Sequence, residues 1–187
     1  MRQGAMLTTQ RLRIRGWEDS EADRAFFHRV NSDEAMLKFY PFRRSREEAD
    51  DLFNLMRARI EKDGFGWAVA EDRDSKVPLG FTGLARIRDE VIGAGVEIGW
   101  RYVPEAWGQG LASEAALALL AHGFDEMRLD RIVAFAVTTN RASLAVMRRI
   151  GMTPRPDCDF DHPGVPDTMP HLKRHAFYQM QAGDPRL

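Results

Sequence analysis

The sequence predicts an α/β fold in which a mixed, mostly antiparallel central sheet is flanked by helices. Two segments with apolar residues at helical spacing follow the first strand-like segment. Three strand-like segments then follow one another across short turns, which favours antiparallel pairing. A later strand-helix-strand unit favours at least one parallel crossover connection.

The first half of the chain is expected to form one strand and two helices before the central strands. Residues 8–17 alternate between apolar and polar positions, which predicts a strand. Asp19 or Ser20 is expected to cap the helix that follows. Ser45 and Glu48 have the spacing of a capping box, so a second helix is expected to begin there.

The second half of the chain is expected to supply most of the sheet. Its strand-like segments are residues 64–70, 79–88, 95–103, 132–137 and 176–180. Its helical segments are residues 109–124 and 140–150. Gly151 follows the second of these helices and is expected to end it as a C-cap glycine.

Length and charge limit the classes to which the protein can belong. A chain of 187 residues is expected to form a single domain over residues 1–187. The net charge of −1, from 27 basic and 28 acidic residues, lacks the positive excess of a nucleic-acid-binding surface. Short basic stretches such as residues 43–46 are expected to be solvated. No stretch is apolar and long enough to span a bilayer, so no membrane partner is expected.

The cysteine content and the N-terminal residues favour a reducing compartment. Cys158 is the only cysteine, so the chain cannot form an intrachain disulfide. No cluster of histidine and cysteine has zinc-ligand spacing, and no metal is expected. Arg11, Arg13 and Arg15 interrupt any apolar core of a signal peptide. A cytoplasmic location is therefore expected.

A glycine-rich run lies between a predicted strand and a predicted helix. Residues 103–115 are Val-Pro-Glu-Ala-Trp-Gly-Gln-Gly-Leu-Ala-Ser-Glu-Ala. Glycine permits close approach by a ligand, and the first amides of a helix are unpaired donors with a favourable dipole. The run therefore predicts an anion site suited to a phosphate or pyrophosphate, with a turn needed only for packing as the alternative.

Two other nucleotide-binding motifs do not fit this run. A Walker loop needs Gly-Lys-Ser/Thr, which is missing. A dinucleotide fingerprint needs a third glycine where Ser113 stands. A nucleotide-dependent kinase would also need a lysine and metal-binding carboxylates that the sequence does not offer.

The run resembles the pyrophosphate loop of the GNAT superfamily of N-acetyltransferases, Gln/Arg-x-x-Gly-x-Gly/Ala. The matching positions are Trp107, Gly110 and Ala112, and Trp107 departs from the usual Gln or Arg. The form Trp-Gly-x-Gly-x-Ala-Ser-Glu-Ala is similar to the RimJ/RimL branch of that family. The resemblance implies that acetyl-CoA binds here as cosubstrate, through backbone amides. The residues that it implies for cofactor binding are Val103, Trp107, Gly108, Gln109, Gly110, Leu111, Ala112, Ser113 and Asn140.

Three further stretches resemble the same family in the expected order. Residues 79–84 resemble its third strand, and residues 95–103 resemble its fourth, which splays from the next parallel strand and pairs with pantetheine. The resemblance implies that Val103 offers its backbone amide there. Residues 139–152 resemble a helix that begins Asn-x-x-Ser, in which the matching Asn140 contacts CoA. The expected fold is therefore GNAT-like, with a splayed strand pair that forms the CoA cleft.

Acetyl transfer to an amine needs a base for the amine and donors for the oxyanion and the leaving thiolate. Glu97 lies mid-strand beside the implied acetyl site and is the candidate base, directly or through water, with an ordinary outward-facing carboxylate as the alternative. Ser143 is the candidate group near the sulfur, with a local helix-start role as its alternative. Many family members place a tyrosine acid where Met147 stands.

Several other residues allow two interpretations. Residues 39–42 either wall the acceptor site or form a packed loop. Tyr178 either reaches the cleft or packs in the sheet, and Arg148 and Arg149 either approach CoA phosphates or are solvated. The tail histidines are expected at the surface or at the edge of the substrate site, namely His162, His171 and His175.

The sequence therefore predicts an acetyl-CoA-dependent N-acetyltransferase that acts on a primary amine by direct attack. The acceptor is expected to be a protein N-terminus or a small-molecule amine. Because members of the family are often dimers, a homodimer is also considered. The alternative is a non-catalytic acyl-CoA-binding regulatory module, which would keep the glycine-rich run and lack the base. Cys158 lies outside the matched motifs and is a poor candidate nucleophile.

Overall fold

The strands form one sheet in the computed structural model, which describes residues 5–89 and 92–185. Its order is β1-β2-β3-β4-β5-β6-β9-β7, and β8 also pairs with β9. Among the described strands, β5 and β6 form a parallel pair and every other pair is antiparallel. The predicted mixed, mostly antiparallel sheet is therefore confirmed. The strands are β1 (Ala5–Thr8), β2 (Leu12–Arg15), β3 (Ala68–Asp72), β4 (Pro78–Arg86), β5 (Val96–Tyr102), β6 (Arg131–Val137), β7 (Thr153–Pro154), β8 (Phe160–Asp161) and β9 (Arg174–Gln181).

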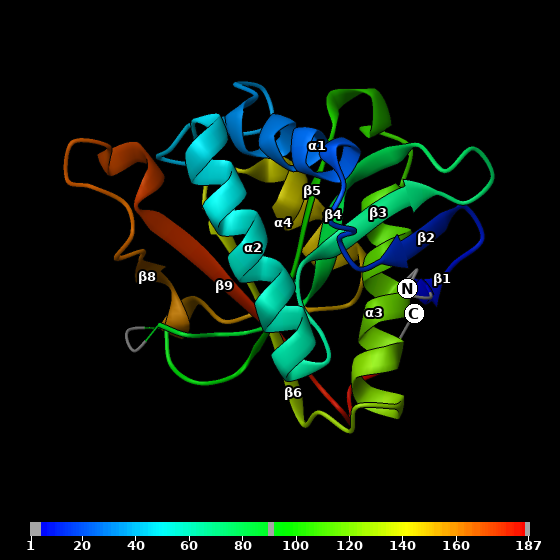
Figure 1. Cartoon of the computed structure of the whole chain (residues 1–187). Helices are drawn as coiled ribbons and strands as arrows, with labels where there is room; N and C mark the ends of the chain where they lie inside the picture. Colours follow the sequence, from blue (N-terminus) through cyan, green and yellow to red (C-terminus); the bar gives the residue numbers. More distant parts are fainter. Residues whose placement is uncertain (1–4, 90–91, 186–187) are drawn as a thin grey trace.

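Four α-helices of the described chain flank this sheet (Figure 1). They are α1 (Glu21–Ser32), α2 (Arg46–Asp63), α3 (Leu111–Asp125) and α4 (Arg141–Arg149). In Figure 1, α1 and α2 lie in front of the strands and α4 lies behind them. The third helix packs on β4 and β5 and also contacts α4. Among the described residues, each helix is too short or too polar to cross a membrane.

The helix ends follow the predicted capping residues. Ser20 Oγ accepts a hydrogen bond from the amide three residues later (3.2 Å), so Ser20 rather than Asp19 caps α1. Ser45 and Glu48 form both halves of the predicted capping box at α2. Gly151 follows α4 with a φ of +83°, the left-handed conformation expected of a glycine that ends a helix.

Two predicted strands have different bounds in the structure. Residues 8–17 do not form one strand, because a tight turn separates β1 from β2. Thr9 closes that turn, since its Oγ1 accepts from Leu12 N at 3.0 Å and its N–H donates to Leu12 O at 2.9 Å. The strand expected from residue 64 begins only at Ala68, because Gly64 ends α2 with a φ of +79°.

Apolar side chains pack on both faces of the sheet. On the α1/α2 face, the rings of Trp17, Phe27 and Phe53 meet edge to face, with centroids 4.9, 5.7 and 5.5 Å apart. On the other face, Val96 and Ile98 of β5 join the core beneath α3. Each such side chain contributes about 1.5–3 kcal/mol on burial, so the clusters hold the helices on the sheet. Alternate residues of β5 therefore face α1 and α2.

Candidate active site

The strands β5 and β6 separate partway along their length. Among the described residues they pair only through residues 96–97 and 132–133, although β5 continues to Tyr102 and β6 to Val137. The other edge of β5 is used along the whole strand, because β4 pairs with it from Val96 to Tyr102. The edge of β5 that faces β6 is therefore unpaired beyond Glu97, as the expected splayed pair requires.

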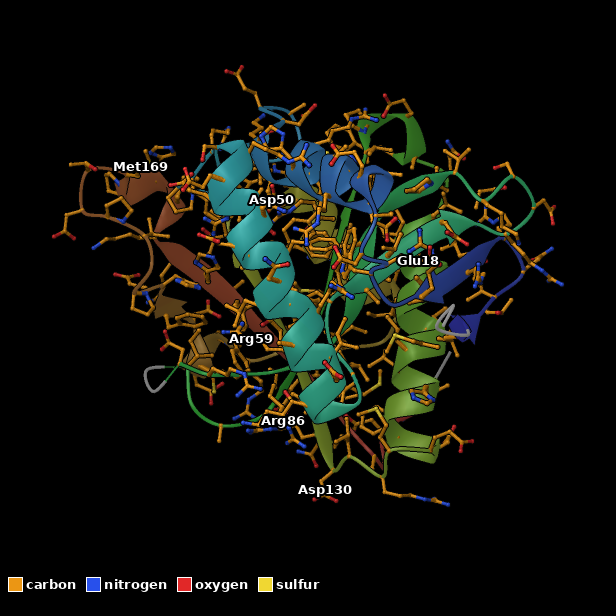
Figure 2. The ribbon with its side chains drawn as sticks, in the orientation of Figure 1. Glu18, Asp50, Arg59, Arg86, Asp130 and Met169 are labelled. Carbon is orange, nitrogen blue, oxygen red and sulfur yellow. The ribbon has the colours of Figure 1, made fainter. Side chains whose placement is uncertain are left out.

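A cavity of about 610 Å³ lies at this opening, against the helices α1 and α2. Arg59 of α2 and Arg86 at the end of β4 belong to its wall, and Figure 2 shows both along one flank of α2. The middle of β5 and the start of α4 meet at the same cavity. The residues from these two elements that the sequence had singled out are Glu97, Asn140, Ser143 and Met147.

Glu97 lines the cavity from the last residue of β5 that pairs with β6. A Cβ atom at Gly99 would lie 2.8 Å from Cη2 of Trp67 and 3.8 Å from Oε1 of Glu97. Glycine at this position therefore makes room for the ring of Trp67 next to the carboxyl group. Burial raises the pKa of Glu97 to about 8. A general base works best when its pKa lies near the working pH, so this position suits the role that the sequence suggested.

The first turns of α4 face the same cavity. Asn140 Oδ1 accepts a hydrogen bond from Ser143 N at 3.2 Å, which confirms the expected N-cap. Ser143 is partly buried, and Met147, one turn further along, is 2% exposed. Since a thioether has no proton to donate, Ser143 is the hydroxyl donor that this helix presents to the cavity.

The glycine-rich run forms the turn that leads into α3. Gly108 and Gly110 have φ values of +73° and +78°, which side chains other than glycine rarely adopt. Gly110 is the N-cap and supplies no side-chain oxygen, so the first amides of α3 keep free donors. These are the donors that a pyrophosphate needs. Residues 107–113 do not line the 610 Å³ cavity, so the run and the cavity are separate features.

Val103 lacks the free backbone amide that the resemblance implies. Its N–H donates to Leu79 O at 2.9 Å, which extends the β4–β5 pairing by one residue. Its carbonyl accepts from Ala106 N at 2.9 Å. The prediction of a free amide at Val103 is therefore wrong. Trp107 anchors the next part of the run, because its Nε1 donates to Tyr102 O at 2.7 Å while the side chain stays 51% exposed.

Two arginines flank the run. Arg149 Nη1 donates to Ser113 Oγ at 3.2 Å, which places a cation beside the first turn of α3. Arg11 Nη1 donates to Gln109 O at 2.9 Å. Arg11 already pairs with Glu114 of α3, at 2.7 Å, so the charge of Arg149 and the free helix-start amides are the features that favour an anion.

Two histidines that line the cavity lie close together, which the sequence did not predict. The ring centroids of His162 and His175 lie 5.0 Å apart, because β8 pairs with β9. Burial lowers the pKa of both rings. A strand of two residues such as β8 leaves no periodic signal in the sequence, whereas His171 is exposed as expected. In the described part of the chain, no group of three or more histidine, cysteine, aspartate or glutamate side chains could hold a metal ion.

The structure bears on two alternatives left open by the sequence. Residues 39–42 line the cavity, and their role at the acceptor site stays a prediction. Tyr178 is a buried residue of β9 outside the cavity lining, and its hydroxyl accepts from Arg148 Nη1 at 3.3 Å. Cys158 is exposed and also lies outside that lining, which agrees with its dismissal as a nucleophile.

Comparison with known proteins agrees with this geometry. Residues 11–153 match the family model for an acetyltransferase (GNAT) domain. YnaD of Bacillus subtilis (strain 168), described as an uncharacterized N-acetyltransferase, is 33% identical over 156 residues, which cover 78% of this chain and 81% of YnaD. The match to the family model includes β5 and α4, the two elements that meet at the cavity.

Solved structures show the same fold. An acetyltransferase of the GNAT family from Bacillus anthracis has a TM-score of 0.77 at 25% identity, over 95% of this chain and 99% of that one. RimL, a ribosomal L7/L12 alpha-N-protein acetyltransferase, has a TM-score of 0.75 at 18% identity, over 96% of this chain and 94% of that one. The chain therefore belongs to the GNAT family and is an acetyl-CoA-dependent acyltransferase.

Proposed function

We propose that the protein transfers the acetyl group of acetyl-CoA to a primary amine by direct attack, as a member of the RimJ/RimL-like branch. The observation that carries the proposal is the meeting of Glu97 and Ser143 at one cavity, beside the unpaired edge of β5. The form of the run from Trp107 and the fold shared with RimL support the branch. The acceptor amine belongs to a protein N-terminus or to a small molecule.

In the proposed mechanism, Glu97 takes a proton from the acceptor amine, directly or through one water. The amine nitrogen attacks the thioester carbonyl carbon, a C–N bond forms, and the C–S bond breaks. The raised pKa of Glu97, about 8, makes its carboxylate a stronger base than that of an exposed glutamate. Ser143 donates a hydrogen bond to the departing thiolate, which takes up a proton from solvent while Glu97 returns its proton to solvent. No covalent intermediate on the enzyme is needed.

Acetyl-CoA supplies the activated acyl group, and the start of α3 is the part of the chain suited to its phosphates. Free amides follow Gly110, and the guanidinium groups of Arg11 and Arg149 lie beside them. Asn140 would contribute at the cavity as well as capping α4. The residues proposed to hold the cofactor are Trp107, Gly108, Gln109, Gly110, Leu111, Ala112, Ser113 and Asn140.

A thermal-shift titration with acetyl-CoA, followed by a thiol-release assay, tests this proposal. We expect acetyl-CoA to raise Tm, as any ligand that binds only the folded state must. We also expect thiol release with at least one acceptor from a panel of amines and peptide N-termini. Stabilisation without turnover on any amine would favour the non-catalytic acyl-CoA-binding module, and no stabilisation by any CoA would exclude both.

The role of Glu97 gives a pH prediction. With an acceptor whose amine stays neutral throughout the range, kcat/KM should rise with pH and level off above about 8, because the base works only once it has lost its proton. Glu97→Gln should lower turnover by about 100- to 10,000-fold and leave the acetyl-CoA thermal shift intact. Glu47→Gln, at an exposed position outside the cavity lining, is the matched control. An unchanged pH profile in the Glu97 variant would remove this residue from the base role.

A further inference from the structure

Arg101 lies in the cavity wall with the faces of its guanidinium group against aromatic rings. Its Cζ is 4.1 Å from the ring centroid of Tyr40 and 4.9 Å from that of Phe81. Nη1 donates to Val30 O at 3.0 Å and to Asn31 Oδ1 at 3.1 Å. Nε is buried and has no hydrogen-bond partner in the described chain. Nε is enclosed by protein, whereas Nη2 is neither buried nor hydrogen-bonded within the described chain, so Nη2 is the donor through which a ligand can reach this group.

Arg44 brings a second guanidinium group to the same place. Its Cζ is 4.1 Å from the ring centroid of Phe42, and the Cζ of Arg101 is 5.9 Å from the same centroid. Its Nε is also buried without a partner among the described residues. Burial lowers the pKa of Arg44, and so does the neighbouring charge of Arg101, whereas Glu48 raises it. Glu48 is exposed and already accepts a hydrogen bond from Ser45 N.

Within residues 5–89 and 92–185, no carboxylate forms an ion pair with either arginine. The carboxylates that line the cavity are Asp63, Asp89 and Glu97. Asp63 is engaged by Arg86, at 3.8 Å, and by Arg88. A guanidinium group withdrawn from water is costly unless a counter-charge or a full set of acceptors compensates it. Two such groups with free donors at one cavity wall form a site that an anion would complete.

We infer that Arg44 and Arg101 bind a carboxylate of the acceptor while its amine reaches Glu97. The inference rests on the proposed function and names the class of substrate. A planar carboxylate matches the in-plane donors of a guanidinium group that stacks on aromatic rings, as both of these groups do. The partners that hold Arg101 in place, Val30 O and Asn31 Oδ1, are uncharged and leave its positive charge for the ligand.

The spacing along β5 indicates how far apart the two ends of the acceptor are. Glu97 and Arg101 lie on the same face of the strand, four residues apart, so their Cα atoms are separated by roughly 13 Å. Side chains of a strand stand roughly perpendicular to the sheet, and the guanidinium group of Arg101 is held at Val30 O and Asn31 Oδ1, so several bonds separate the amine from the carboxylate. The acceptor is therefore an ω-amino carboxylic acid rather than a plain α-amino acid.

The experiment compares acceptors that differ only in the charge of the far end. The enzyme is saturated with acetyl-CoA, and thiol release is measured with 6-aminohexanoate and 6-aminohexanamide, and with 4-aminobutyrate and its amide. We expect kcat/KM to be about 10- to 100-fold higher for each carboxylate, the range for hydrogen bonds to a charged group. Equal rates, or faster turnover of the amides, would overturn the inference.

Two variants test the residues themselves. Arg101→Gln and Arg44→Gln should each bring the carboxylate-to-amide ratio toward one, mainly through KM, and thermal unfolding establishes that each variant is folded. Arg46→Gln is the control, because Arg46 pairs with Glu21 at 3.0 Å and Asp50 at 3.1 Å and does not line the cavity. It should keep the wild-type ratio. The inference is contradicted if both cavity variants keep the wild-type carboxylate-to-amide ratio. It is also contradicted if they lose acetyl-CoA binding while the ratio stays unchanged.

A binding measurement separates this inference from the proposed function. By calorimetry on the protein saturated with CoA, 6-aminohexanoate should bind about tenfold or more tightly than its amide, and Arg101→Gln and Arg44→Gln should each remove the difference. That result without turnover on any amine would exclude the proposed function and uphold the carboxylate site. Turnover of neutral amines, with no preference for the carboxylate over its amide in either assay, would uphold the proposed function and exclude the carboxylate site.

Discussion

Two arginines of the same sheet, the buried Arg15 in β2 and the partly buried Arg101 in β5, have opposite kinds of partner. Arg15 forms a two-pronged pair with Asp23, in which Nη1 donates to Oδ2 at 2.7 Å and Nη2 to Oδ1 at 2.8 Å. Its Nε donates to Glu71 Oε2 at 2.7 Å. Arg101 instead has aromatic rings on its faces, two neutral acceptors on Nη1 and no partner for Nε in the described chain.

This difference separates a charge that serves the fold from one that is open to a ligand. The hydrogen bonds and charges of Asp23 and Glu71 raise the pKa of Arg15 despite its burial, so β2, β3 and α1 are tied together through one guanidinium group. Every nitrogen of Arg15 already has an acceptor. The burial of a charged residue is therefore a poor guide to function by itself, and the inventory of its partners is the better one.

The largest expected effect is on the paired arginine. Arg15→Met should lower the free energy of unfolding by about 3–5 kcal/mol, because it leaves the buried carboxylate of Asp23 without its cation and leaves Glu71 with Arg13 alone. For a chain of this length that corresponds to a fall in Tm of about 10 °C. Urea denaturation followed by circular dichroism measures the change. A loss below about 1 kcal/mol would mean that the cluster does not hold the fold.

Helix caps and strand faces were predictable from the sequence. The tertiary hydrogen-bond partners of individual groups were not. Ser20, Ser45 and Gly151 act within a few residues of themselves, so their capping roles follow from the sequence pattern. Alternation in β5 likewise placed Glu97 on a strand face. The free amide at Val103 failed as a prediction because Leu79, on another strand, takes it.

The basic stretch at residues 43–46 is a second case in which tertiary contacts could not be predicted from the sequence. It was expected to be solvated, yet Arg44 packs on Phe42 and lines the cavity with a buried Nε. The connection between α1 and α2 meets Arg101 through the rings of Tyr40 and Phe42, and Arg101 lies more than fifty residues away in the sequence. His162 and His175 meet for a similar reason, through a strand of two residues. Pairings set by tertiary contacts leave no periodic signal in one sequence.

The second prediction concerns the contribution of Arg101 to the stability of the protein. We expect it to be much smaller than the contribution of Arg15. Arg101→Met should lower the free energy of unfolding by about 1 kcal/mol, through the loss of hydrogen bonds to neutral acceptors and of the contact with Tyr40. Its Met side chain keeps the apolar packing of the stem. The same urea titration measures it beside Arg15→Met. A loss as large as that of Arg15→Met would make Arg101 a structural charge and remove the contrast.

The smallest effect is expected at Arg44. Burial and the charge of Arg101 both lower the pKa of Arg44, so the folded protein holds this charge at a cost that the unfolded chain does not have. Arg44→Met should therefore change the free energy of unfolding by no more than about 0.5 kcal/mol, in either direction. The repulsion is measurable by a double-mutant cycle with Arg101→Met.

The sign of that coupling follows from the like charges. Each single substitution removes the same repulsion, so the second one brings no further relief, and the double variant should be less stable than the sum of the two single effects predicts. Added salt should shrink the coupling, because it screens the two cations in the wild type. A saturating ω-amino carboxylate should also shrink it, since the ligand places a negative charge between them. A coupling of the opposite sign would mean that the two guanidinium groups do not face one common site.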